Sequence, residues 1–64
     1  MEKCYIVEYT EFIKDTNSFK FGWRNLDGKY SGEPIYLINN DTALKVLSKC
    51  KKLNGYYQIK EVYV

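Results

Sequence analysis

Residues 39–55 constrain the fold most, because they form the one amphipathic helix that the sequence predicts. Their apolar side chains recur at three- and four-residue spacing, which gathers them on one helix face: Ala43, Leu44, Val46, Leu47, Cys50 and Leu53. Asn40 or Asp41 is expected to cap the start, since a short polar side chain accepts a hydrogen bond from the first turn. Asn54-Gly55 supplies a left-handed stop. We expect this helix to cover one face of a sheet.

Four other segments have the alternation or the composition of β-strands, three of them before the helix and one after it: residues 3–13, 19–26, 33–38 and 56–64. Pro34 cannot donate to a ladder, so the third segment should lie at an edge or begin there. Whether it is a true strand or an extended loop stays open.

Turn residues separate these segments. The polar run 14–18 is expected to join the first two strands. Asp27-Gly28 favours a tight hairpin turn after the second strand, and a longer loop through Gly32 is the alternative. The alternation of the last strand is imperfect near Lys60-Glu61, which suggests a bulge there.

This order predicts a small α+β domain over residues 1–64, with a three- to four-stranded, mostly antiparallel sheet and one amphipathic helix on one face (βββαβ). The first strand is apolar on both faces, so we expect it to be internal. The predicted strand order is 3-2-1-4, with the first and last strands parallel and joined by a right-handed crossover.

Length and charge bound the class of protein. A chain of 64 residues has room for one domain, and its net charge of +2 does not by itself indicate a nucleic-acid partner. No apolar signal region follows Met1, and no apolar run is long enough to span a membrane. We therefore expect a cytoplasmic protein. Cys4 and Cys50 are expected to be buried thiols; a disulfide between them and a reactive Cys50 are the alternatives.

The composition also suggests a coding bias. The chain has nine Lys and one Arg, with abundant Asn, Ile and Tyr. Such a bias suits an AT-rich gene, as in a low-GC bacterium, one of its phages or a mobile element.

The residues that catalysis usually requires are scarce. The chain has no His and only two Cys, too few for a zinc site made from Cys and His alone. Without His there is no Ser-His or Cys-His pair, and the glycines form no phosphate-binding motif. We expect no catalytic residue, no cofactor and no metal, and therefore a protein that is not an enzyme.

Aromatic residues are in surplus. Seven Tyr, three Phe and one Trp exceed what one short helix can cover. Exposed aromatic side chains often mark a protein interface, so we predict binding to a protein partner, or self-association, through Tyr5, Tyr9, Trp23, Tyr36, Tyr57 and Tyr63. The alternative is that these tyrosines only cap a thin sheet, with the ring inward and the hydroxyl in water.

The helix offers a second hypothesis, in which the protein binds nucleic acid. Lys45, Lys49 and Lys52 are spaced to contact phosphates. Trp23 with Arg24 could stack on bases beside them. An ordinary solvated helix face is the simpler interpretation of these lysines.

Overall fold

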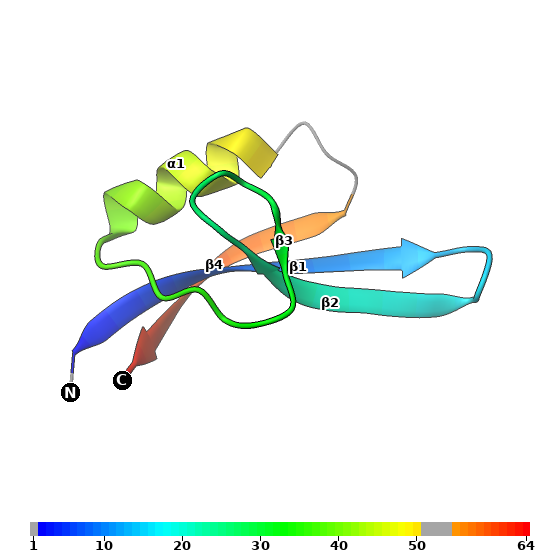
Figure 1. The fold of residues 1–64 in the computed structure, drawn as a ribbon, viewed down its shortest axis with the longest axis horizontal. Helices are drawn as coiled ribbons and strands as arrows, with labels where there is room; N and C mark the ends of the chain where they lie inside the picture. The colour runs from blue at the N-terminus through cyan, green and yellow to red at the C-terminus, as the bar shows by residue number, and fades with distance from the viewer. Residues whose placement is uncertain (1, 51–54) are drawn as a thin grey trace.

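A four-stranded sheet with one helix on one face makes up the chain in this computed structural model, which describes residues 2–50 and 55–64 (Figure 1). The elements are β1 (Lys3–Ile13), β2 (Ser18–Arg24), β3 (Tyr30–Ser31), α1 (Asn40–Cys50) and β4 (Tyr56–Tyr63). The molecule measures 40 × 23 × 14 Å. The predicted α+β class is confirmed.

The strand order is β3-β2-β1-β4, as predicted, with β1 inside the sheet. β1 is internal because both of its faces are apolar: Val7 is fully buried on one face and Ile6 is 6% exposed on the other. Consecutive strand residues point to opposite faces, so both sides of β1 are covered at these two residues.

The predicted parallel pairing of the first and last strands is wrong, because β4 runs antiparallel to β1. The chain after β3 returns to β1 through an irregular segment, residues 32–39. There, Leu37 exchanges two backbone hydrogen bonds with Tyr5, at 2.8 and 2.9 Å. This return places the start of α1 beside the beginning of β1 (Figure 1). The helix then runs forward along the sheet, so β4 starts opposite Thr10 and comes back.

The third strand was predicted at 33–38, but in that range Leu37 makes only an isolated bridge. The strand that pairs with β2 is Tyr30–Ser31, because the predicted turn at Asp27-Gly28 closes early and sets Arg24 opposite Tyr30. Gly28 adopts a φ of 79°, and its N–H donates to the carbonyl of Asn25 at 2.9 Å. The hairpin at Asp27-Gly28 is confirmed over the longer loop.

The expected bulge at Lys60-Glu61 is absent. Ile6 lies opposite Lys60 and Tyr5 lies opposite Glu61, in an unbroken register along the whole of β4. The apolar–polar alternation of the sequence is interrupted at this point because Glu61, although charged and exposed, points to the helix side of the sheet. Its carboxylate lies 3.4 Å from the Lys3 ammonium group.

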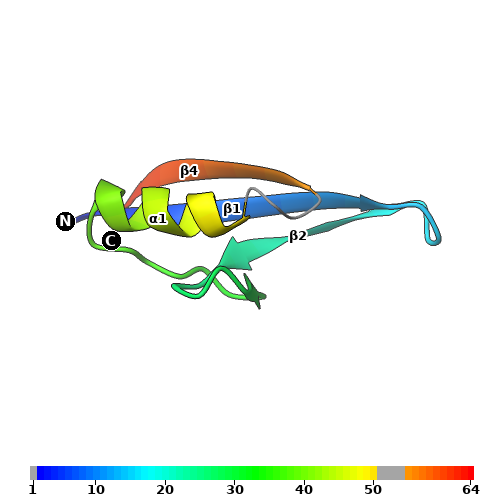
Figure 2. The same ribbon diagram turned by 90° about the horizontal axis from the view of Figure 1, so that it is seen from above.

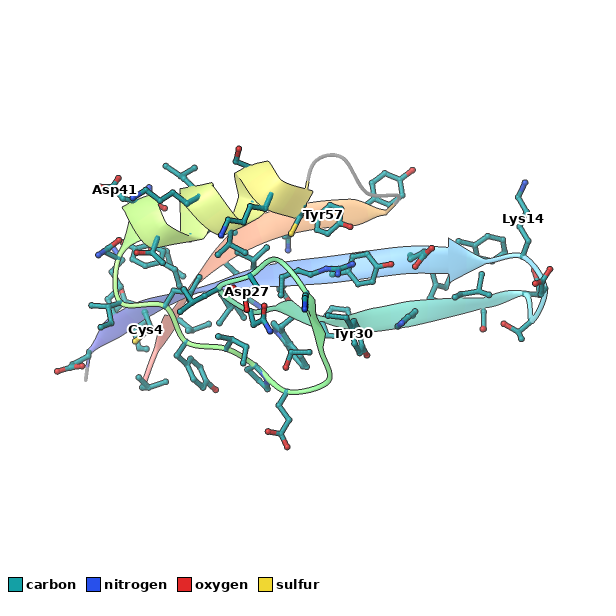
Figure 3. The ribbon with its side chains drawn as sticks, turned by 45° about the horizontal axis from the view of Figure 1, so that its top comes forward. Cys4, Lys14, Asp27, Tyr30, Asp41 and Tyr57 are labelled. Atoms are coloured by element: carbon teal, nitrogen blue, oxygen red, sulfur yellow. The ribbon has the colours of Figure 1, made fainter. Side chains whose placement is uncertain are left out.

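The helix begins at Asn40. Its cap is Asn39, one residue before the predicted caps Asn40 and Asp41. The Asn39 Oδ1 accepts hydrogen bonds from the backbone N–H of Thr42 at 2.8 Å and from its hydroxyl at 2.9 Å. Asp41, labelled in Figure 3, lies in the first turn, where its charge suits the helix dipole. Of the predicted stop at Asn54-Gly55, Asn54 lies outside the described residues, and Gly55 adopts a φ of 120°.

The core lies between α1 and one face of the sheet. It is formed by Val7, Leu37, Ala43, Val46 and Cys50. Leu47 packs against it, but Leu44 is 48% exposed, contrary to its expected place on the apolar face, and Leu53 lies outside the described residues. Cys4 and Cys50 are free and buried, which confirms the buried-thiol prediction.

Candidate functional site: an aromatic sheet face

The sheet surface that faces away from α1, here called the open face, carries the candidate site. Val7 and Ile59 pack toward α1, so the alternate strand residues point the other way. Cross-strand pairs assemble them: Glu8 lies opposite Trp23 and Gln58, Thr10 opposite Phe21 and Tyr56, and Phe12 opposite Phe19. Lys60 follows on β4, opposite Ile6.

Aromatic rings form most of this surface. The Phe12 and Phe19 ring centroids lie 5.2 Å apart, and so do those of Phe21 and Trp23, the latter edge to face. Phe19 is 72% exposed and Tyr56 is 82% exposed. Such an exposed set of large apolar rings is unusual on a small domain and is typical of a surface that contacts another molecule.

Part of the open face belongs to a two-stranded ribbon. The pairing of β1 with β4 ends at Thr10, whereas its pairing with β2 continues to Ile13. Figure 1 shows this β1–β2 hairpin reaching beyond both α1 and β4. Phe12 and Phe19 lie on that extension, where neither the helix nor a third strand supports them. An isolated two-stranded ribbon of this kind is only marginally stable, because two strands bury few side chains.

A shallow hollow of about 190 Å³ interrupts the open face where β1, β2 and β4 meet. Its lining comprises Glu8, Thr10, Phe21, Tyr56, Tyr57 and Gln58. The Gln58 side-chain amide donates to the Glu8 carboxylate at 3.1 Å, so this charge has a partner within the site. The hollow therefore combines aromatic walls with one polar pair.

Among the sequence-predicted interface residues, Trp23 alone lies within the open face. Its Nε1 is buried and, among the described residues, has no hydrogen-bond partner, which costs stability. Tyr36 and Tyr63 are exposed elsewhere, at 52% and 61%. Tyr36 lines a second concavity of about 370 Å³, between the β2–β3 turn and the start of α1.

The other three predicted residues lie on the helix side of the sheet. Tyr5 packs against the core, and the Tyr9 ring lies 5.1 Å from the Tyr57 ring. Tyr30, labelled with Tyr57 in Figure 3, meets Tyr9 edge to face at 6.2 Å. The rings of these tyrosines thus pack against other residues of the same chain.

Sequence reasoning missed Phe12, Phe19, Phe21 and Tyr56. A signal for two of them was present, since Phe19, Phe21 and Trp23 alternate with Lys20, Gly22 and Arg24. The register of β1 with its neighbours then brings Phe12 and Tyr56 to the same face.

Arg24 is the buried charge that the sequence did not indicate. It is 8% exposed, and its guanidinium carbon lies 4.1 Å from the Tyr9 ring centroid and 5.4 Å from that of Tyr57. Its Nη1 and Nη2 donate to the Gly28 carbonyl and the Tyr57 hydroxyl, both at 3.3 Å. Trp23 and Arg24 point to opposite sides of the sheet, so the expected joint stacking on a base is wrong.

Burial changes the acidity of this cluster. Burial raises the pKa of Tyr9 to about 12, and the hydrogen bond from its hydroxyl to the Glu11 carboxylate adds to the effect. Burial likewise raises the pKa of the Cys50 thiol, although the Arg24 charge opposes it. Cys50 is fully buried, so the alternative of a reactive thiol there is wrong.

Of the three lysines of the nucleic-acid hypothesis, the structure describes Lys45 and Lys49. Both are exposed, and the Lys49 ammonium group donates to the carbonyl of Leu26 at 3.1 Å. Lys52 lies outside the described residues.

Within residues 2–50 and 55–64, no group of three or more His, Cys, Asp or Glu side chains could hold a metal ion. No helix in this part of the chain is long and apolar enough to cross a membrane. Comparisons with protein-family models, with curated proteins and with solved structures find no match. The open face is therefore interpreted from its own residues.

Proposed function

We propose that this protein is a small non-enzymatic interaction module that binds an apolar surface of another protein through the open face. One observation supports this most strongly: Phe12, Phe19, Phe21 and Tyr56 are between 46% and 82% exposed on one continuous sheet surface. Aromatic side chains are enriched at protein interfaces, where a few residues carry most of the binding energy. A cytoplasmic setting, and an origin in a phage or mobile element, remain parts of this proposal.

The chemistry of the surface favours a protein over a nucleic acid. On the open face, Glu8 is the acidic side chain beside the aromatic rings. Among the described strand residues that point to this face, Lys60 is the one basic side chain. Binding to a phosphate backbone requires several cations along the contact. The lysines of α1 lie on the other side of the sheet, so they cannot join the aromatic rings in one contact.

Site-specific photo-cross-linking in cells of the native host tests the proposal. A photoreactive phenylalanine analogue replaces Phe19 in one variant and Leu44 in another. Both side chains are exposed and apolar, but Leu44 lies on the helix. We expect the Phe19 position to give a discrete adduct with one protein. We expect the Leu44 position to lack that adduct. Identical adducts from both positions, or none from Phe19, would contradict the proposal.

A further inference from the structure

The outer side of β4 is an open edge of the sheet. β4 stands last in the strand order, so within the described residues no strand pairs with its far side. Figure 2 shows β4 along one long side of the sheet, with α1 lying over β1 beside it. The strand has no Pro over Tyr56–Tyr63, and its register has no bulge. Proline and bulges are among the devices that prevent an edge from pairing with another chain.

The hydrogen-bond pattern identifies which backbone groups face that edge. Glu2 and Val64 exchange two backbone hydrogen bonds, at 2.9 and 3.0 Å. Hydrogen-bonded pairs alternate with non-bonded pairs along an antiparallel ladder. Residues an odd number of positions before Val64 therefore direct their N–H and C=O groups away from β1. From residue 59 to the end of β4 these are Ile59, Glu61 and Tyr63.

We propose that two copies of the chain pair antiparallel through this edge of β4, with Glu61 opposite Glu61 of the second copy. In this register the outward groups of all three residues bond among themselves, because each Ile59 lies opposite Tyr63 of the other copy. The shared ladder runs from residue 59 to residue 63 and spans about 13 Å, which is four steps at the usual strand rise.

Side chains favour this register over its neighbour. Ile59 meets the Tyr63 ring of the other copy, an aliphatic–aromatic pair of the kind that stabilises sheets. The two Glu61 carboxylates approach, but each lies 3.4 Å from its own Lys3 ammonium group, so two negative and two positive charges meet. Shifting the axis to Lys60 would oppose two lysines, and Lys60 makes no ion pair with a described residue.

The symmetry has a consequence for the open face. An antiparallel edge pairing has its two-fold axis perpendicular to the sheet, so both open faces lie on the same side. The dimer is thus one sheet of twice the width with a doubled aromatic surface. That consequence rests on the proposed function of the open face, whereas the dimer itself does not.

Sedimentation velocity over a wide range of protein concentrations tests the pairing with a matched pair of variants. Glu61→Pro and Glu61→Gln both remove the charge, but only proline also removes the outward N–H. That N–H does not bond to β1, so we expect the proline variant to fold. We expect wild type and Glu61→Gln to dimerise. Glu61→Pro should weaken the dimer about tenfold or more, since each copy loses a backbone hydrogen bond. A monomeric wild type, or equal dimerisation by both variants, would overturn the proposal.

Disulfide trapping tests the register independently of that proline. In a hydrogen-bonded antiparallel pair the Cα atoms lie about 5.5 Å apart, within disulfide range. Under mild oxidation, Glu61→Cys should form a covalent dimer and Lys60→Cys should form far less. The native thiols do not compete, because Cys4 and Cys50 are buried. The reverse preference, or no covalent dimer from either variant, would overturn the proposed pairing. Partner cross-linking from Phe19 is a separate readout, so failure of one proposal does not imply failure of the other.

Discussion

The guanidinium carbon of Arg24 lies 4.1 Å from the centre of the Tyr9 ring. The only arginine of the chain is thus buried against an aromatic face, on the helix side of the sheet. A cation held this way gains from the negative ring face, and its fork of N–H groups reaches the Gly28 carbonyl and the Tyr57 hydroxyl. Arg24 therefore joins β2, the β2–β3 turn and β4.

Replacing Arg24 should destabilise the fold. Arg24→Ala removes the stacking, two hydrogen bonds and the packed aliphatic stem, and we expect a loss of about 2–4 kcal/mol in the free energy of unfolding. Arg24→Lys keeps the charge without the planar fork and should lose less. Urea denaturation measures both variants. Lys14→Ala, in the exposed β1–β2 turn, is the control, and an equal loss there would contradict the assigned role.

A side chain at Gly22 should destabilise the fold, because β3 and the Tyr30 ring lie against this residue. A Cβ at Gly22 would come within 2.5 Å of the Tyr30 ring and 2.8 Å of the Ser31 carbonyl oxygen. We expect Gly22→Ala to cost about 1–3 kcal/mol, as overpacking does. Gly32→Ala is the matched control, since a Cβ there meets nothing within 4 Å. Thermal unfolding compares the two, and a Gly22→Ala variant as stable as the control would show that β3 does not pack as described.

The residue that caps α1 is Asn39, whereas the sequence favoured Asn40 or Asp41. Asn39→Ala removes the acceptor for the Thr42 N–H and should cost about 1 kcal/mol. Asn40→Ala, one residue later in the first turn, should change stability by much less. Chemical denaturation of the two variants decides the question. A larger loss for Asn40→Ala would restore the prediction made from the sequence.

Stability should fall at high pH because of Tyr9. Its pKa is raised from the ordinary value of 10.0 to about 12 by burial, so the folded state favours the neutral phenol. Below pH 10 this contribution is fully present. It is lost as the pH rises from about 10 to about 12, because Tyr9 ionises more readily in the unfolded chain.

Tyr9→Phe should therefore reduce the fall in unfolding free energy across that pH range, measured by urea denaturation at a series of pH values. Tyr56→Phe is the control, because the Tyr56 ring is 82% exposed. If both variants followed the wild-type curve, Tyr9 would not be the group responsible. Tyr57, whose pKa burial also raises, leaves a residual slope in either case.

Local patterns were sufficient for much of the fold. The apolar spacing predicted α1, Asp27-Gly28 predicted the second hairpin, and the two apolar faces of β1 predicted its internal place. The direction of β4 was not predictable in the same way. It depends on the return of residues 32–39 to the start of β1, and the Tyr5–Leu37 pairing that fixes this return has no local signal.

The candidate site was harder to predict for a related reason. When both faces of β1 are apolar, alternation alone does not say which face α1 covers. Tyr9 and Tyr57 were consequently assigned to the interface, whereas they line the Arg24 cluster under the helix. The alternation on β2 showed that Phe19 shares a face with Phe21 and Trp23, but not which face that is. The face is fixed only by the structure, where Val7 points toward α1 and Phe19, paired with Phe12, points away from it.

The central claim is that the open-face rings serve binding and contribute little to folding. Phe19 and Phe21 are 72% and 51% exposed, so the double variant Phe19→Ser/Phe21→Ser should retain nearly all of its thermal stability. The matched control is Ile38→Ser/Leu44→Ser, which removes exposed apolar side chains near and within α1.

The most direct measurement is the cross-linking yield from a photoreactive residue at Tyr56 in these two backgrounds, in cells of the native host. Losing two interface aromatics should lower the yield of the partner adduct about tenfold or more, since each such residue often contributes above 1 kcal/mol. The control background should leave the yield unchanged. An undiminished adduct in the Phe19→Ser/Phe21→Ser background would contradict the account.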